Sequence, residues 1–172
     1  MQRRHFLQAA GTAAAVLGAP RAFAQALPAG PIRLIVGFPA GGGADALGRV
    51  IAEKLTLLWK QQVIVENKAG ASSTLAAEFV AQQPADGSTL LLSTINSHAL
   101  APAVQPRLRY HPERDFTPVA LLGVTPNLLI AGTDQRVKSL AEVVALCKAK
   151  PGQVSFGSAG PGTIQHFAIE MF

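Results

Sequence analysis

The first part of the chain alternates short apolar runs with longer stretches of helical periodicity. The apolar run 32–37 follows Pro31 and predicts a buried strand. After Gly43 the apolar residues recur at helical spacing, which predicts an amphipathic helix. The buried face predicted for this helix consists of Leu47, Val50, Ile51, Leu55 and Leu58.

Two further apolar runs, 62–66 and 89–93, predict a second and a third strand. Between them a helical pattern extends to about Gln83, with Ser72 or Ser73 as its N-cap. Three strands that alternate with two helices are typical of a parallel sheet covered on both faces. We therefore expect an α/β fold.

The rest of the chain is less regular. Apolar runs predict strands at 116–124, 127–131 and 154–157. A serine followed three residues later by a glutamate, Ser139 and Glu142, predicts a capping box that opens a helix.

Both ends of the sequence carry further signals. Residues 1–24 combine paired arginines, an alanine-rich apolar segment and a final Ala22-Phe23-Ala24, which predicts an export signal cleaved after Ala24 and a periplasmic protein. Arg3-Arg4 before Phe6-Leu7 resembles a twin-arginine signal, although general-secretion signals also carry arginines. At the other end the chain stops within an apolar helical pattern that begins at Ile164, from which we expect a fragment of a longer protein.

Composition favours a folded protein that does not bind nucleic acid. Of the 172 residues, 49% are hydrophobic and 15% are charged, which is typical of a chain with a large core. The net charge is +5, but three arginines lie in the first 24 residues, which leaves 12 basic against 10 acidic residues. The basic residues are scattered and form no stripe, so no nucleic-acid partner is expected. The single cysteine, Cys147, excludes an internal disulfide and a cysteine-based zinc site.

The most informative stretch is the glycine loop between the first strand and the first helix. Gly41, Gly42 and Gly43 carry no side chains, so their N–H groups can face a ligand. The following helix start adds partial positive charge and unpaired donors. A second loop of this design, 158–163, follows the predicted strand 154–157. In an open parallel sheet both loops lie where ligands bind, and they predict a site for a phosphate or a carboxylate.

The side chains near these loops give weaker signals. Asp45 is either an acceptor for a ligand amine or a group that bonds loop N–H donors. His98, after the third strand, either donates to a carboxylate or bonds to local backbone. Ser158 and His166 lack an orienting acid and a nucleophile elbow, so no catalytic residue is predicted. The histidines and acids show no metal-ligand spacing, so no metal is expected.

A dinucleotide-binding fold is the main alternative. Gly41, Gly43 and Ala46 satisfy the pattern Gly-x-Gly-x-x-Gly/Ala, and Glu66 lies where a ribose-binding acid belongs. Residues 39–40 separate the glycines from the strand end, where that fingerprint needs its first tight turn, and this counts against it. On this alternative the protein is an exported dinucleotide-dependent oxidoreductase.

Five short motifs occur in order, and the family match that they carry extends over nearly all of residues 31–172. They are Phe38-Pro39-Ala40-Gly41-Gly42-Gly43-Ala44-Asp45 with Arg49, Glu66-Asn67-Lys68-Ala69-Gly70-Ala71, Asp86-Gly87-Ser88-Thr89-Leu90-Leu91, Asp115-Phe116-Thr117-Pro118-Val119-Ala120, and Gly157-Ser158-Ala159-Gly160-Pro161-Gly162-Thr163 with His166 and Glu170. This series resembles the Bug family, the periplasmic solute-binding proteins of tripartite tricarboxylate transporters.

The resemblance implies a type II, Venus-flytrap periplasmic-binding-protein fold with parallel-type sheets that closes over a small carboxylate solute. It implies a first α/β lobe over 25–124 and the start of a second, incomplete lobe over 125–172. It also implies no enzyme activity, no cofactor, and membrane permease subunits as partners. The ligand-binding residues that it implies are Phe38, Ala40, Gly41, Gly42, Gly43, Ala44, Asp45, Ser72, Ser73, Ser93, Ser97, His98, Ser158, Gly160 and Thr163.

Two departures from the family pattern concern the solute. The family usually has a threonine where Ala44 stands, so a hydroxyl donor is missing here. It usually has glycines where Ser72 and Ser73 stand, and these extra hydroxyls either reach the ligand or cap the helix. The solute therefore stays open, and a sensory receptor of the same fold is a further alternative.

Overall fold

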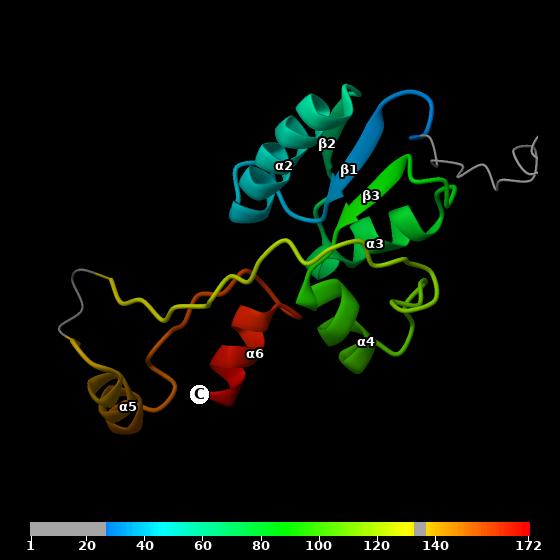
Figure 1. Cartoon of the computed structure of the whole chain (residues 1–172). Coiled ribbons are helices and arrows are strands. Elements are labelled where there is room, and N and C mark those ends of the chain that lie inside the picture. Colours follow the sequence, from blue (N-terminus) through cyan, green and yellow to red (C-terminus); the bar gives the residue numbers. More distant parts are fainter. Residues whose placement is uncertain (1–26, 133–136) are drawn as a thin grey trace, which may run out of the picture.

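The computed structural model describes residues 27–132 and 137–172, so the predicted export signal lies outside the described residues. Three strands, β1 (Ile32–Val36), β2 (Val63–Asn67) and β3 (Thr89–Leu92), form one parallel sheet in the order β2-β1-β3 (Figure 1). In this register Leu34 lies opposite Val65 on one side and Leu90 on the other. The predicted parallel α/β architecture is confirmed.

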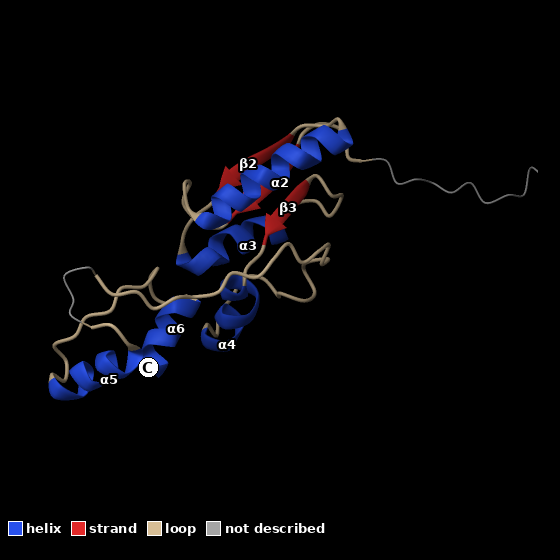
Figure 2. Cartoon of the chain, turned by 60° about the vertical axis from the view of Figure 1, so that its left-hand side comes forward, coloured by secondary structure: helices blue, strands red, loops and turns tan. Residues whose placement is uncertain are grey.

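Helices cover both faces of the sheet because alternate side chains of a strand point to opposite faces. Ile32, Leu34 and Val36 pack against α2 (Gly43–Trp59) and are buried. On the other face the Arg33 guanidinium lies 5.1 Å from the ring centre of Phe79 in α3 (Thr74–Ala81). In Figures 1 and 2 the sheet runs between these two helices.

The predicted buried face of α2 is right only in part, since Leu55 packs against the core and Ile51 is half-buried. Leu58 is 75% exposed, and Leu47 and Val50 are exposed too, whereas Gly48 and Ala52 are buried against the sheet. A Cβ atom at Gly48 would lie 3.0 Å from Val36 Cγ2, so the missing side chain allows close approach of helix and strand. Small residues therefore face the sheet, and the leucines at 47 and 58 turn outward.

Of the two residues predicted as the N-cap of α3, Ser72 and Ser73, the second occupies the N-cap position, but its side chain makes no capping hydrogen bond. Both belong to a short 3-10 turn, η1 (Ala71–Ser73), and α3 begins at Thr74. The φ angles of Ala71, Ser72 and Ser73 are 45°, 54° and 74°. A side-chain cap requires extended backbone at the N-cap residue, and left-handed backbone does not provide it.

Beyond β3 the chain forms a single π-helical turn, η2 (Asn96–Leu100), followed by α4 (Ala101–Val104), α5 (Leu140–Ala149) and α6 (Ile164–Met171). The predicted capping box opens α5, since Ser139 Oγ accepts the Glu142 N–H at 3.3 Å. Glu142 Oε2 reaches back to the N–H of Lys138 at 2.6 Å, one residue before the expected partner.

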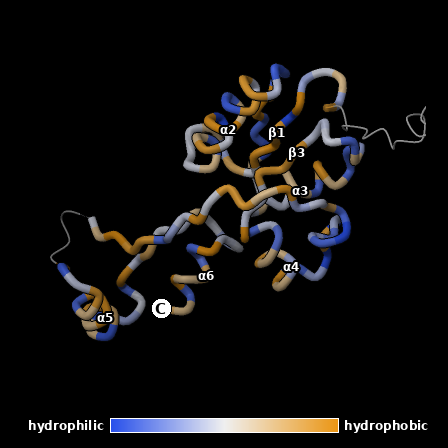
Figure 3. The backbone as a smooth tube through the Cα atoms, in the orientation of Figure 1, coloured by the Kyte–Doolittle hydropathy of each residue, from blue (hydrophilic) through white to orange (hydrophobic). Residues whose placement is uncertain are grey.

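The predicted strands at 116–124, 127–131 and 154–157 are wrong within the described residues. Both views show these segments as extended chain that links the sheet to α5 and α6, with no arrow drawn on them (Figures 1 and 2). Leu121 and Ile130 are each 85% exposed, and Figure 3 shows hydrophobic residues along the first of these links. An apolar run becomes a strand only where a neighbouring chain completes the hydrogen-bond ladder.

Candidate functional site

Four loops meet at the carboxyl edge of the sheet. Asn67, which ends β2, donates through Nδ2 to the carbonyl of Phe38 after β1 at 3.0 Å. The turn η1 packs closely against Gly37, the residue that follows β1. A Cβ atom built at Gly37 would come within 1.9 Å of Ser73 Oγ. Hydrogen bonds from Ser72 and Asn96 join this edge to the second glycine loop.

The first glycine loop exposes the uncapped start of α2. Its N-cap residue, Gly42, has extended backbone with φ −79° and ψ 168°, and among the described residues no side chain caps the helix. The first intrahelical bond runs from Ala46 N–H to the Gly42 carbonyl at 2.9 Å. Helix geometry therefore leaves the N–H groups of Gly43, Ala44 and Asp45 without an intrahelical acceptor.

The space beside these donors is open. Within the described structure no atom lies within 4 Å of a Cβ built at Gly41 or Gly43, and the nearest to one at Gly42 is the Pro39 carbonyl oxygen at 3.4 Å. Ala40 is exposed beside them, and Phe38 is half-buried at the edge of the core. An anion placed here would meet main-chain donors and the positive end of the helix dipole.

Asp45 holds the loop in this shape. Its carboxylate is 3% exposed and accepts the Gly41 N–H, the Arg49 Nε–H and the Asn67 Nδ2–H, each at 2.9 Å. The bond from Arg49, followed by those from Gly41 and Asn67, holds the pKa of the Asp45 carboxyl well below its usual range. Of the two roles open to Asp45, the structure shows the bonding of loop donors.

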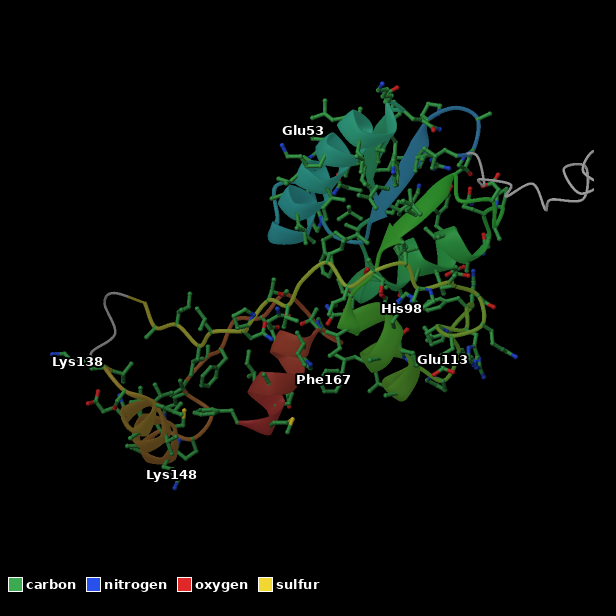
Figure 4. All side chains as sticks on the ribbon, in the orientation of Figure 1. Glu53, His98, Glu113, Lys138, Lys148 and Phe167 are labelled. Atoms are coloured by element: carbon green, nitrogen blue, oxygen red, sulfur yellow. The ribbon has the colours of Figure 1, made fainter. Side chains whose placement is uncertain are left out.

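The loop after β3 is packed rather than open. Ser97 is buried, and its Oγ donates to the Thr94 carbonyl at 3.3 Å and lies 3.0 Å from His98 Nδ1. The His98 ring meets the Phe116 ring edge-on at a centroid distance of 4.7 Å, and burial lowers the pKa of His98. Figure 4 labels His98 beside α4, below the end of β3. Ser93 is exposed at the start of this loop.

The second glycine loop docks onto the first part of the chain. Ser72 Oγ donates to the Pro161 carbonyl at 2.7 Å, and Asn96 Oδ1 accepts the Ile164 N–H at 3.1 Å. Within this loop Thr163 is buried and caps α6, its Oγ1 accepting the His166 N–H at 3.3 Å. Ser158 is exposed and its Oγ accepts the N–H of Gly160 at 3.2 Å. The second glycine loop therefore contacts η1 and η2, the turns that follow β2 and β3.

Three residues of this arrangement were not among the predicted site residues. Asn67 and Arg49 orient Asp45, and Asn96 joins the third loop to α6. Asn67 and Arg49 belong to motifs noted in the sequence, but their common partner was not evident there. Asn96 follows β3 by a few residues, and its position at a strand's carboxyl end was the only available signal.

Glu66 does not have the role that a dinucleotide-binding fold requires. Arg33 donates to it twice, from Nε at 2.6 Å and from Nη2 at 2.8 Å, and this contact lowers the pKa of Glu66. A ribose hydroxyl would have to share this carboxylate with Arg33, so the pairing gives no support to a ribose-binding role for Glu66.

Residues 27–132 and 137–172 also bear on other kinds of site. In these ranges no group of His, Cys, Asp and Glu has metal-site geometry, and no helix has the length and hydropathy of a membrane span. A groove of about 360 Å³ lies away from the glycine loops, between α5 and α6, and is lined by residues including Val144, Cys147, Phe156 and Phe172.

Comparison with known protein families places these features in context. Residues 47–172 match the model of the tripartite tricarboxylate transporter family receptor. Protein BugT of Bordetella pertussis is 36% identical over 168 residues, which are 97% of this chain and 50% of BugT. The chain thus spans about half the length of the curated relatives it matches.

Solved structures agree with this match. Rpa4515 of R. palustris with adipate has a TM-score of 0.80 at 33% identity, covering 84% of this chain and 48% of that one. MatC (Rpa3494) of Rhodopseudomonas palustris with bound malate has a TM-score of 0.76 at 33% identity, covering 84% and 49%. The periplasmic binding protein BugD has a TM-score of 0.71 at 28% identity, covering 84% and 48%. The described fold is that of periplasmic binding proteins of this kind.

Proposed function

The chain belongs to the tripartite tricarboxylate transporter receptor family, and we propose on that premise that it binds a small carboxylated solute at the carboxyl edge of its sheet. The observation that carries the proposal is the uncapped start of α2, where the N–H groups of Gly43, Ala44 and Asp45 lack an intrahelical acceptor and the glycines leave the neighbouring space open. Adipate and malate, bound to two similar proteins, are both dicarboxylates.

The charges at this edge suit a carboxylate held by neutral donors. Asp45, the charged residue nearest the glycines, is neutralised by Arg49 at 2.9 Å. A carboxylate therefore meets N–H groups and the helix dipole without a competing free acid. Residues 40–45 would form the centre of the site, with the hydroxyls of η1 and of the second glycine loop around it.

The wider role follows from the family. We propose that the protein is exported to the periplasm, closes two lobes that meet near Val124 over its solute, and passes the solute to membrane permease subunits. In such a receptor the solute favours the closed form, because only that form contacts both of its ends. No catalytic step or cofactor belongs to this proposal.

Thermal unfolding of the purified protein with separate ligands tests the proposal. The panel contains adipate, malate, citrate, acidic amino acids, aromatic carboxylates, nicotinamide and NAD. A solute at about 100 times its Kd adds about 2.7 kcal/mol to the free energy of unfolding, which raises the midpoint by several degrees. We expect this shift with at least one carboxylate and none with its uncharged amide.

The same assay separates the alternatives. A shift with NAD alone would replace the receptor by the oxidoreductase. Absence of any shift with every carboxylate would overturn the carboxylate proposal. Loss of growth on the identified solute after deletion of the gene separates transport from a purely sensory role.

A further inference from the structure

We propose that Ser72 and Asn96 are positioning residues that clasp the second glycine loop to the first part of the chain and thereby slow the release of solute. This inference rests on the proposed function, since the solute is taken to lie between the two glycine loops. Ser72 and Asn96 contact main-chain atoms of that loop, and neither has to touch the solute.

The Ser72 contact joins residues 89 positions apart in the sequence. The Ser72 hydroxyl donates to the Pro161 carbonyl at 2.7 Å, from a turn in which Ser72 has a φ of 54°. A Cβ atom at Gly162 would lie 3.3 Å from Ser72 Oγ, which is tighter than an ordinary contact. The loop thus reaches Ser72 closely because residue 162 has no side chain.

The Asn96 contact caps a helix from a distant element. Ile164 is the first residue of α6, so its N–H has no acceptor within the helix. Asn96, 5% exposed on η2, supplies the acceptor Oδ1 at 3.1 Å. Thr163 already accepts the His166 N–H, so Asn96 adds a second cap that joins α6 to η2.

The two bonds act on the same short segment, Pro161 to Ile164. Because both loop partners are main-chain atoms, the bonds fix the position of the backbone itself. Both clasping side chains precede residue 124, and both partners lie in the proposed second lobe, so separation of the lobes breaks both bonds. One hydrogen bond contributes about 0.5–1.5 kcal/mol, so its loss should speed opening about twofold to tenfold.

The experiment compares the full-length protein with Ser72→Ala, Asn96→Ala and the double variant. The matched control is Asn127→Ala, which removes a 3.0 Å bond to Gln165 of α6 whose two ends both lie beyond residue 124. Dissociation of the carboxylate that stabilises the wild type is followed by surface plasmon resonance. We expect a rate about twofold to tenfold higher in each single variant, more in the double variant, and unchanged in the control.

A measurement without solute keeps the clasp testable when the panel contains no ligand. Exchange of the Ile164 amide, followed by NMR, should be about twofold to tenfold faster in Asn96→Ala. Asn96→Asp, which keeps the acceptor, should restore the protection. Wild-type rates of both exchange and dissociation in the double variant would overturn the clasp, whereas a wild type that binds no carboxylate but shows the exchange difference would overturn only the proposed function.

Discussion

Replacement of Ser73 by glycine should stabilise the protein, because two features of this residue, its backbone conformation and its buried hydroxyl, are energetically unfavourable. Its backbone is left-handed, with φ 74° and ψ 2°, which costs a non-glycine residue about 1–2 kcal/mol. Its hydroxyl is 1% exposed and has no hydrogen-bond partner among the described residues, and such a group costs about 1–3 kcal/mol. About 0.5–1 kcal/mol of this gain is lost, because a glycine gives the unfolded chain more conformational freedom.

The net expectation for Ser73→Gly is a gain of about 1–4 kcal/mol in the free energy of unfolding. At about 2–4 °C per kcal/mol, differential scanning calorimetry should detect it as a clear rise in the midpoint. Ser73→Ala removes the hydroxyl but keeps the left-handed Cβ, so its midpoint should lie between those of wild type and Ser73→Gly. An unchanged or lower midpoint for Ser73→Gly would refute the assigned strain.

A second substitution checks the same contact from the other side. A Cβ atom at Gly37 would lie 1.9 Å from Ser73 Oγ and 2.6 Å from Ser73 Cβ, so Gly37→Ala should destabilise by about 1–3 kcal/mol or more. In the Ser73→Gly background both of these atoms are gone, and the cost should fall. Equal costs in the two backgrounds would show that the packing of η1 against β1 is not as described.

Three further outcomes follow from the structure. Gly42→Leu should fold normally, since φ is −79°, but lose the carboxylate-dependent rise of the unfolding midpoint, and a retained rise would exclude the loop as the site. Because its pKa is lowered on folding, the Asp45 carboxylate stabilises the protein at pH values above its unfolded pKa of about 3.9. The wild-type unfolding midpoint should therefore decrease as the pH is lowered beyond about 4, whereas that of Asp45→Asn should start lower at neutral pH and decrease less. Parallel profiles of midpoint against pH would contradict this. In α2, denaturant unfolding should show a cost of about 1–3 kcal/mol for Ala52→Leu and less than about 0.5 kcal/mol for Leu58→Lys, the reverse of what the apolar pattern alone predicts.

The sheet could be predicted because continuous apolar runs bounded by turn residues are a strong signal of buried parallel strands. The outward position of Leu47 and Leu58 in α2 could not be predicted, since the helix also packs through Gly48, where the absence of a side chain adds no hydrophobicity to the pattern. The segments near Leu121 and Ile130 were predicted as strands from their apolar runs and are not strands, because apolar composition does not specify whether a neighbouring strand is present.

The candidate site divides in the same way. The glycine loops were evident, because three adjacent glycines before a helix are a local signal. The supporting contacts were not, since Asn67 meets Asp45 across 22 positions and Asn96 meets Ile164 across 68. The positive φ angles of Ser72 and Ser73 were hidden as well, because serine at these positions is compatible with an ordinary N-cap.

The first glycine loop also bears on how receptors of this design diversify. A main-chain N–H is encoded by no particular side chain, so a point mutation removes it only by introducing proline. The residues around the loop are therefore free to drift in size and polarity while the anion-binding donors persist. Receptors that bind carboxylates through such a loop can therefore change their solute specificity by successive substitutions without passing through a variant that no longer binds carboxylates.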